Sequence, residues 1–274
     1  MFRKIDRKYF QPKAYVRKAF FTSAKVLLAL KVPLKVRTRV NDVVIIFNAT
    51  SYTEFVLRAR ESYRREEVTM FWLNNVVGSP DVVYDIGANV GAYSLYAGKR
   101  ANCVNGGQTV YAFEPAFTNF FSLCRNIELN KLNDIIIPFP LAFGQQREET
   151  AFFLRSTQAG AALHGVSHPS SEGSRFDPKF HQGVSVTSLD SFVQNSGIAF
   201  PNHLKIDVDG SELEIIKGAQ QTLLDTRLRS IMIEINEDIS QGRIETLITN
   251  SGFEEDRREK WKSKNTFNKL YLRK

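Results

Sequence analysis

Four residues near the middle of the chain, Asp85, Gly87, Gly91 and Glu114, have the types and spacing of a nucleotide-cofactor site. The stretch VVYDIGANVG is an apolar strand that ends in an acid and a glycine-rich turn, and a helical stretch follows it. Such a turn presents backbone N–H groups to a ligand. Glu114 ends the next apolar stretch, where a carboxylate can accept both hydroxyls of a ribose.

Three ligand classes compete for this turn. A phosphate-binding P-loop needs G-x-x-x-x-G-K-[ST], which the sequence does not have here. A dinucleotide site needs G-x-G-x-x-G, but Ala88 and Asn89 directly follow the first glycine. S-adenosylmethionine has a sulfonium and an ammonium but no phosphate, so it suits an acid placed before the glycines. We therefore expect S-adenosylmethionine, with a nicotinamide-dependent oxidoreductase as the alternative and a helix cap as the structural interpretation of Asp85 alone.

A second polar group follows a later apolar stretch, KIDVDG. Alternation in a strand places Lys205, Asp207 and Asp209 on one face, and the next strand brings Glu234 close by. These residues are the catalytic candidates, with Asp207 as the first choice for the base that receives a proton from the methyl acceptor or positions it. The same carboxylates are hard oxygen ligands that suit Mg²⁺. The structural alternatives are a Lys205–Asp207 ion pair that supports the strand and Asp209 as a helix cap.

Alternating strands and helices predict the framework that positions both groups. Apolar stretches with little alternation are typical of a parallel sheet covered on both faces. The strands are expected at 81–87, 109–115, 135–144, 203–210 and 229–236, with helices at 92–101, 117–131, 211–225 and 239–251 and an antiparallel pair within 252–274. Ligands bind such sheets beyond the carboxyl ends of the strands.

Several motifs in this order resemble the FkbM-type S-adenosylmethionine-dependent methyltransferases. The matching stretches are VVYDIGANVGAYSLYA, AFEPAFTNFFSLCRNIELNKLND, VTSLDSF, LKIDVDGSELEIIKGA and IMIEIN. The sequence departs from the family pattern at Asp209, where Glu is more common, and at Ser211, where Ala is common.

The resemblance implies a class I methyltransferase fold, which is Rossmann-like, with seven mostly parallel strands. It also implies that the Gly87–Gly91 turn lies under the cofactor, that Glu114, followed by Pro115, contacts the ribose, and that Ala142 lies near the adenine. Family members typically methylate hydroxyls of sugars, glycans and natural products, so we expect a small-molecule or glycan acceptor.

The 274 residues carry a net charge of +8 that is unevenly distributed. Residues 1–40 hold twelve Lys and Arg and one acid, a charge of +11, so the other 234 residues sum to −3. We expect a helix over 13–31 and a β-hairpin within 35–50, followed by a helix over 51–76. The basic helix either packs on the body or docks on an anionic membrane. An RNA-binding or RNA-methylating protein is a further alternative, but the acidic body makes nucleic acid a poor partner.

The expected organisation is an N-terminal arm over 1–79 and a methyltransferase domain over 80–274. Residues 155–183 are rich in Ser, Gly, Pro and His and break the alternation, which is typical of a substrate lid. No stretch has the length and apolar content of a membrane span or a cleaved signal peptide. We therefore expect a cytoplasmic protein, with peripheral contact to the inner face of a membrane through residues 1–40.

Overall fold

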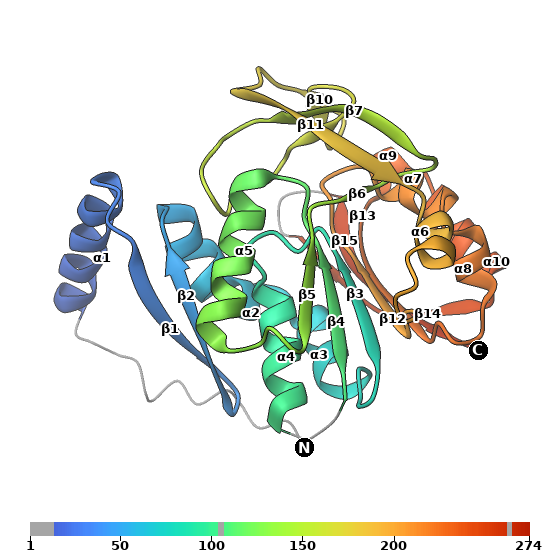
Figure 1. Cartoon of the computed structure of the whole chain (residues 1–274), viewed down its shortest axis with the longest axis horizontal. Coiled ribbons are helices and arrows are strands. Elements are labelled where there is room, and N and C mark those ends of the chain that lie inside the picture. Colours follow the sequence, from blue (N-terminus) through green and yellow to red (C-terminus); the bar gives the residue numbers. More distant parts are fainter. Residues whose placement is uncertain (1–13, 104–106, 262–264) are drawn as a thin grey trace.

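A seven-stranded sheet forms the centre of the molecule (Figure 1). The computed structural model describes residues 14–103, 107–261 and 265–274. The strand order is β14-β15-β13-β12-β3-β4-β5. The bounds are β3 Val82–Ile86, β4 Thr109–Phe113, β5 Ile136–Phe139, β12 His203–Ile206, β13 Ser230–Asn236, β14 Phe253–Lys260 and β15 Thr266–Arg273. β15 is antiparallel to both of its neighbours and the remaining pairs are parallel, so the predicted seven-stranded, mostly parallel sheet is confirmed.

The order in which successive strands are added to the sheet reverses between the neighbouring strands β3 and β12. From β3 the sheet grows through β4 to β5, whereas from β12 it grows through β13 the other way. In open α/β sheets a crevice forms at such a switch point, outside the carboxyl ends of the strands. The glycine-rich turn follows β3, and the KIDVDG segment begins in the last two residues of β12 and continues beyond it, so the fold brings the two polar groups of the sequence to one place.

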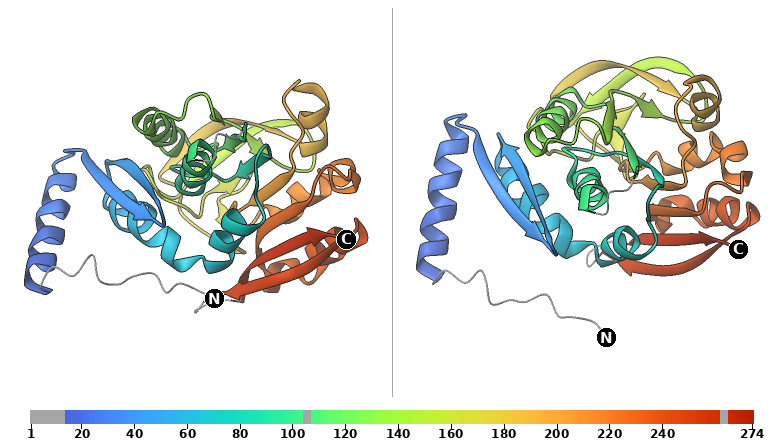
Figure 2. Two further views of the ribbon diagram at one scale, coloured as in Figure 1. Left: turned by 90° about the horizontal axis from the view of Figure 1, so that it is seen from below. Right: turned by 60° about the horizontal axis from the view of Figure 1, so that its bottom comes forward.

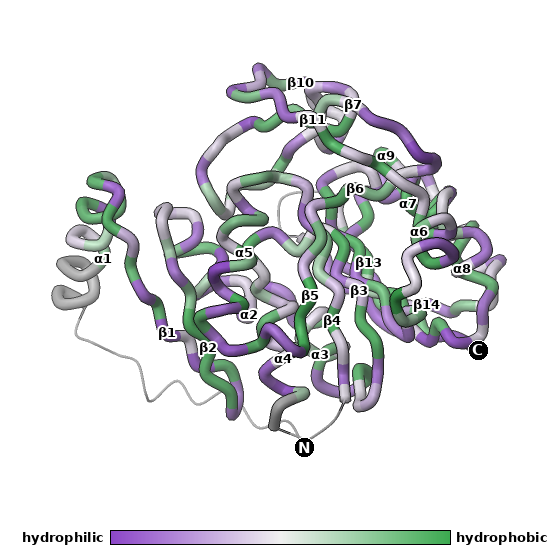
Figure 3. The backbone as a smooth tube through the Cα atoms, in the orientation of Figure 1, coloured by the Kyte–Doolittle hydropathy of each residue, from purple (hydrophilic) through white to green (hydrophobic). Residues whose placement is uncertain are grey.

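Helices cover both faces of the sheet, and alternation along the strands divides the core in two. Val83 and Val110 face the first core, with helices α3, α4 and α5, while Tyr84 and Tyr111 face the second, with α6, α7, α8 and α10. Hydrophobic residues follow the central strands in Figure 3. The bounds are α3 Glu67–Asn75, α4 Ala92–Cys103, α5 Phe117–Asn130, α6 Leu189–Asn195, α7 Glu212–Lys217, α8 Gln220–Leu224, α9 Glu237–Ser240 and α10 Arg243–Asn250.

Several predicted elements are divided into shorter ones. The helix expected over 211–225 is α7 and α8, and the one expected over 239–251 is α9 and α10. The helix expected over 51–76 is a π-helix η2 Glu54–Glu61, then α2 Ser62–Arg65 and α3. The strand expected over 135–144 is β5 and a short β6 Ala142–Phe143, because β6 leaves the central sheet and pairs with β11.

The N-terminal segment packs against the sheet and shares its first core. α1 Ala14–Ala29 lies at one edge of the molecule beside the predicted hairpin, which is β1 Leu34–Val40 and β2 Val43–Ala49 (Figure 2). Ala24 and Leu28 of α1 are buried in this core together with Phe47 and Trp72. The Trp72 indole donates to Ser230 Oγ at 2.7 Å, which ties α3 to the sheet. Residues 1–13 of the basic arm lie outside the described residues.

A second, four-stranded sheet lies over the carboxyl edge of the first. It consists of β6, β7 Glu148–Leu154, β8 Gly165–Val166 and β11 Phe180–Thr187, in the order β6-β11-β7-β8. The 155–183 segment is therefore not a loop throughout, because it contains β8, the start of β11, and the small hairpin of β9 Ser170–Ser171 and β10 Ser174–Arg175. Its role as a substrate lid stays a prediction.

Candidate active site

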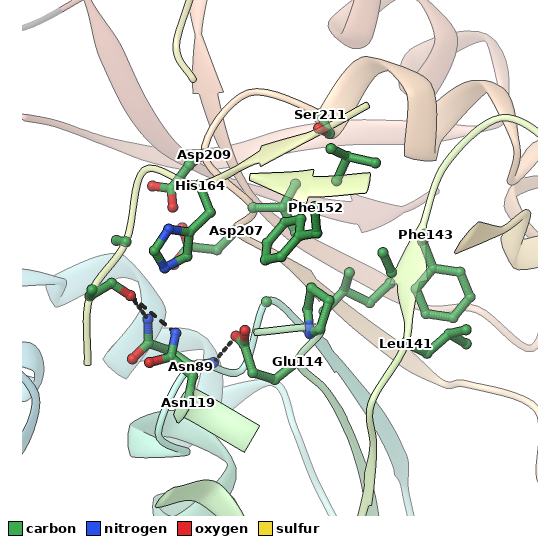
Figure 4. Close-up of a pocket in the computed structure, with 18 residues that line it drawn as sticks. Asn89, Glu114, Asn119, Leu141, Phe143, Phe152, His164, Asp207, Asp209 and Ser211 are labelled. Carbon is green, nitrogen blue, oxygen red and sulfur yellow. Dashed lines mark hydrogen bonds between the residues drawn. The ribbon is translucent and has the colours of Figure 1, made fainter. Parts of the chain in front are cut away.

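A cavity lies between the carboxyl ends of β3, β4 and β12 and the second sheet (Figure 4). Seven of the residues expected from the sequence line it: Gly87, Asn89, Glu114, Pro115, Ala142, Asp207 and Asp209. Asp85, Ala88, Gly91, Lys205 and Glu234 are not among its lining residues. The structure therefore brings five of the eight predicted cofactor residues and two of the four predicted catalytic residues to one cavity.

Glu114 joins the ends of β3 and β4. Its Oε2 accepts a hydrogen bond from Asn89 N at 2.9 Å and its Oε1 accepts one from Ala116 N at 2.8 Å. Burial raises the pKa of this carboxyl to about 7, although both backbone donors oppose the shift. Glu114 lines the cavity, and a carboxylate there can accept hydrogen bonds from the hydroxyls of a diol.

The two glycines of the turn are required by the packing of the protein itself. Gly87 has φ 85°, and a Cβ there would lie 1.9 Å from the carbonyl oxygen of Asp207. Gly91 has φ 89°, and a Cβ there would meet the side chain of Leu123 on α5. Ala88 is buried, and its N–H donates to Phe113 O. The turn is thus held against β4, α5 and the segment after β12.

Asp85 points away from the cavity. It is 2% exposed, and its Oδ2 accepts a hydrogen bond from Ser94 Oγ at 2.5 Å. Lys205 is its partner in the register of β3 and β12, and the Lys205 ammonium lies 4.0 Å from Asp85 Oδ1. Burial raises the pKa of Asp85, and Lys205 opposes that shift. The acid before the glycines therefore lies beside a buried lysine, on the inner side of the strand.

Lys205 connects Asp85 to Asp207. Its ammonium is almost fully buried and donates to Asp207 Oδ2 at 2.8 Å. Burial favours protonation of Asp207, but the neighbouring ammonium outweighs it and holds the pKa of Asp207 below its ordinary value. Asp207 lines the cavity, so it presents an ionised carboxylate there.

The predicted alternation required Asp209 to lie on a strand, which it does not, whereas Glu234 lies on β13 with its carboxylate close to that of Asp209. β12 ends at Ile206, and Asp209 has φ 64°, so the backbone turns before it reaches Asp209. Burial and the charge of Asp207 raise the pKa of Asp209 to about 6. Glu234 accepts a hydrogen bond from the Trp261 indole at 2.7 Å, and burial followed by Asp207 and Asp209 raises its pKa to about 9. Carboxylate oxygens of Glu172, Asp209 and Glu234 lie within 4.8 Å of one another.

Residues 159–164, here called the cover segment, cross the cavity from the second sheet. Ala161, Ala162 and His164 line the cavity from this segment. Figure 4 shows His164 beside Asp209 and across the cavity from Glu114.

The cover segment is held by side chains from four other parts of the chain. The hydrogen bonds are Ser51 Oγ to Ala159 O (2.5 Å), Arg58 Nε to Gly160 O (3.0 Å), Gly160 N to Asn119 Oδ1 (2.8 Å), Asn89 Nδ2 to Ala161 O (2.9 Å) and Leu163 N to Asp209 Oδ2 (2.7 Å). Arg58 of the π-helix η2 and Ser51, which lies before that helix, therefore help to build the site from outside the sheet.

Sequence reasoning missed several residues of the site, of which three are the most informative. Arg58 and Asn119 hold the cover segment, and Phe152 lines the cavity. A signal existed for Asn119, because it is a polar residue on the buried face of α5. Nothing in the spacing of Arg58 or Phe152 marks them, since their contacts join parts of the chain that are far apart in sequence.

One protein-family model matches the sequence over most of the residues that form the site. The family model of the methyltransferase FkbM domain matches residues 85–255, which run from the end of β3 through the cavity residues to the start of β14. The chain belongs to the FkbM methyltransferase family. The resemblance seen in the sequence motifs is thereby confirmed, and the protein is a methyltransferase of this family.

Two characterised relatives of this FkbM-family chain are 25% identical to it. Hexuronic acid methyltransferase AglP of Haloferax volcanii aligns over 210 residues, which are 74% of this chain and 79% of the relative. 31-O-demethyl-FK506 methyltransferase FkbM of Streptomyces tacrolimicus aligns over 198 residues, 63% of this chain and 72% of the relative.

A solved structure of methyltransferase FkbM from Methylobacillus flagellatus is 17% identical to this chain, with a TM-score of 0.47. The alignment covers 73% of this chain and 45% of that one.

Proposed function

We propose that this FkbM-family chain transfers the methyl group of S-adenosylmethionine to a hydroxyl of a sugar, glycan or natural product. The observation that carries the proposal is the single cavity that holds Glu114, the Gly87–Asn89 turn and Asp207. Glu114 would hold the ribose, the turn would lie beneath the methionine portion, and Ala142 and Pro115 would lie near the adenine. The two curated relatives are named for a hexuronic acid and for 31-O-demethyl-FK506, which supports a hydroxylated acceptor.

Asp207 would act on the acceptor. Methyl transfer to oxygen is an in-line displacement at the sulfonium carbon, in which the hydroxyl loses its proton as the C–O bond forms. An ionised carboxylate at this edge can orient the hydroxyl and receive that proton. Asp209, with a pKa near 6, is the second candidate for the base.

Calorimetric titration of the purified protein tests the cofactor assignment. We expect S-adenosylmethionine to bind with a stoichiometry of one, and NADH and a short RNA to give no heat of binding. Transfer of a radiolabelled methyl group to a panel of sugars, uronic acids and macrolides then identifies the acceptor class. Binding of NADH without binding of S-adenosylmethionine would overturn the proposal.

We further propose that the N-terminal segment docks on anionic membrane surfaces. α1 packs through Ala24 and Leu28, yet Val26 on the same helix is 53% exposed beside the exposed Lys25, and Leu30, directly after the helix end, is 69% exposed. Apolar side chains next to basic ones are the pattern of helices that lie in a lipid interface. None of the helices in the described ranges has the length and apolar content to cross a bilayer.

Binding to phosphatidylserine vesicles should decrease steeply with added salt, because the segment acts largely through charge. Leu30→Ser should weaken the binding, while Leu224→Ser, a matched change at the 65% exposed Leu224 of α8, should leave it unchanged. Cosedimentation with vesicles measures both. Equal binding of the two variants would show that α1 is only a packed helix. A variant that tests the basic arm by deletion should lack residues 1–13 only. A longer deletion would remove core residues, which are Ala24 and Leu28 of α1 and Val36 and Val40 of β1.

A further inference from the structure

The imidazole of His164 is held in one orientation within the cover segment. Its Nδ1 accepts a hydrogen bond from Arg155 N at 3.2 Å. Its ring packs edge-on against Phe152, with ring centroids 5.7 Å apart. The side chain is 8% exposed and lines the cavity that also holds Glu114 and Asn89 (Figure 4).

These contacts assign the tautomer. Because Nδ1 accepts a hydrogen bond, a neutral ring carries its proton on Nε2. Burial, followed by the charge of Arg58, lowers the pKa of His164 to about 4, so the ring is neutral near pH 7. Neither nitrogen of this tautomer has a free lone pair, so His164 in this position is not a general base.

The Nε2–H donor lacks a partner in the described part of the chain. The Nε2 atom is buried from solvent and has no hydrogen-bond partner there. A buried donor without an acceptor is unfavourable, and native proteins rarely keep one without a use. Because His164 lines the cavity, an oxygen of a ligand bound there is the acceptor that the arrangement lacks.

We propose that His164 Nε2–H donates a hydrogen bond to an oxygen of bound S-adenosylmethionine. The inference rests on the proposed function, because it identifies the occupant of the cavity with the cofactor. The cofactor is favoured over the methyl acceptor because His164 faces Glu114 across the cavity, and Asn89 of the glycine turn holds the cover segment through Ala161 O (Figure 4). The ribose hydroxyls would donate hydrogen bonds to Glu114, and their oxygens would still have lone pairs that can accept one from His164. The methionine carboxylate offers a second acceptor. His164 would thus clamp the cofactor from the side opposite the glycine turn.

The test compares His164→Phe with His164→Gln and His168→Phe in the full-length protein. Phe keeps the packing against Phe152 but has no donor, whereas the Gln amide places a donor near the position of Nε2. His168 is exposed and does not line the cavity, so it is the matched control. We expect His164→Phe to weaken S-adenosylhomocysteine binding about 3- to 10-fold, as for the loss of one neutral hydrogen bond. His164→Gln should recover part of the affinity and His168→Phe should match the wild type.

Titration with 5′-methylthioadenosine identifies the cofactor oxygen. A loss with both ligands points to the ribose, and a loss with S-adenosylhomocysteine alone points to the carboxylate. The ¹⁵N chemical shift of His164 Nε2 should be that of a protonated nitrogen in the free protein and should change when S-adenosylhomocysteine is added. A histidine with a purely structural role would show no such change. If the wild type binds S-adenosylhomocysteine and His164→Phe binds it with the same affinity, this inference is overturned and the proposed function stays intact. If the wild type binds no cofactor, the proposed function itself fails.

Discussion

Replacing Asp207 by Asn should lower the rate of methyl transfer by about 10²–10⁴-fold, the usual effect of losing a positioned acid–base group. The Asn side chain keeps the shape but removes the charge that Lys205 maintains on Asp207 at 2.8 Å. Because Glu114 and the glycine turn are untouched, the affinity for S-adenosylhomocysteine should stay within about twofold. Single-turnover transfer of a radiolabelled methyl group, with calorimetry on the same preparations, measures both quantities.

The neighbouring carboxylates provide the comparison. Asp209→Asn should give a smaller loss, and Glu234→Gln smaller still, because Glu234 does not line the cavity and already accepts a hydrogen bond from Trp261. If Asp207→Asn transferred methyl groups at the wild-type rate, Asp207 would be only a structural partner of Lys205. The base would then be sought in Asp209, which also lines the cavity.

A divalent cation is the alternative way for these carboxylates to act. The three acids whose oxygens come together are Glu172, Asp209 and Glu234, and Asp207 is not among them. Since Lys205 already supplies a positive charge at Asp207, we expect EDTA to leave the transfer rate unchanged. A loss of activity that Mg²⁺ restores would show that the acids hold a metal which lowers the pKa of the acceptor hydroxyl.

The sequence predicted the sheet because its strands and helices alternate with strong apolar patterns and its motifs match a family. It also predicted that Glu114 and the glycine turn would serve one cofactor site, since both follow the carboxyl ends of strands. The same alternation could have placed Asp85 correctly. Asp85 is two residues from Val83, so both face the first core, where Lys205 neutralises the acid.

The covering part of the site could not be predicted in the same way. Residues 155–183 have no strand or helix period, and their partners, such as Ser51, Arg58 and Asp209, lie far away in the sequence. The left-handed conformation of Asp209, a non-glycine residue, is imposed by tertiary contacts such as that with Leu163 N and is not visible as a motif.

The second large effect concerns cofactor binding by Glu114. Glu114→Ala should weaken S-adenosylmethionine binding by about 1.5–3 kcal/mol, the usual contribution of hydrogen bonds to a charged group. The binding should also depend on pH, because burial raises the pKa of the Glu114 carboxyl to about 7 in the free protein. A carboxylate that accepts two ribose hydroxyls must be ionised, so affinity should decrease as the pH falls below about 7 and level off above it. Calorimetry across this pH range measures the change.

The pH dependence separates Glu114 from other buried acids. At pH 6 the free carboxyl is largely protonated, so binding should release a proton, and the heat of binding should vary with the ionisation enthalpy of the buffer. Glu114→Gln cannot titrate and should lose both the proton release and the pH dependence. Glu66→Gln is the matched control, because burial also raises the pKa of Glu66 to about 7 although its side chain does not line the cavity. If Glu66→Gln abolished the pH dependence and Glu114→Gln kept it, the titrating group would be Glu66, and the assignment of Glu114 to the ribose would lose its support.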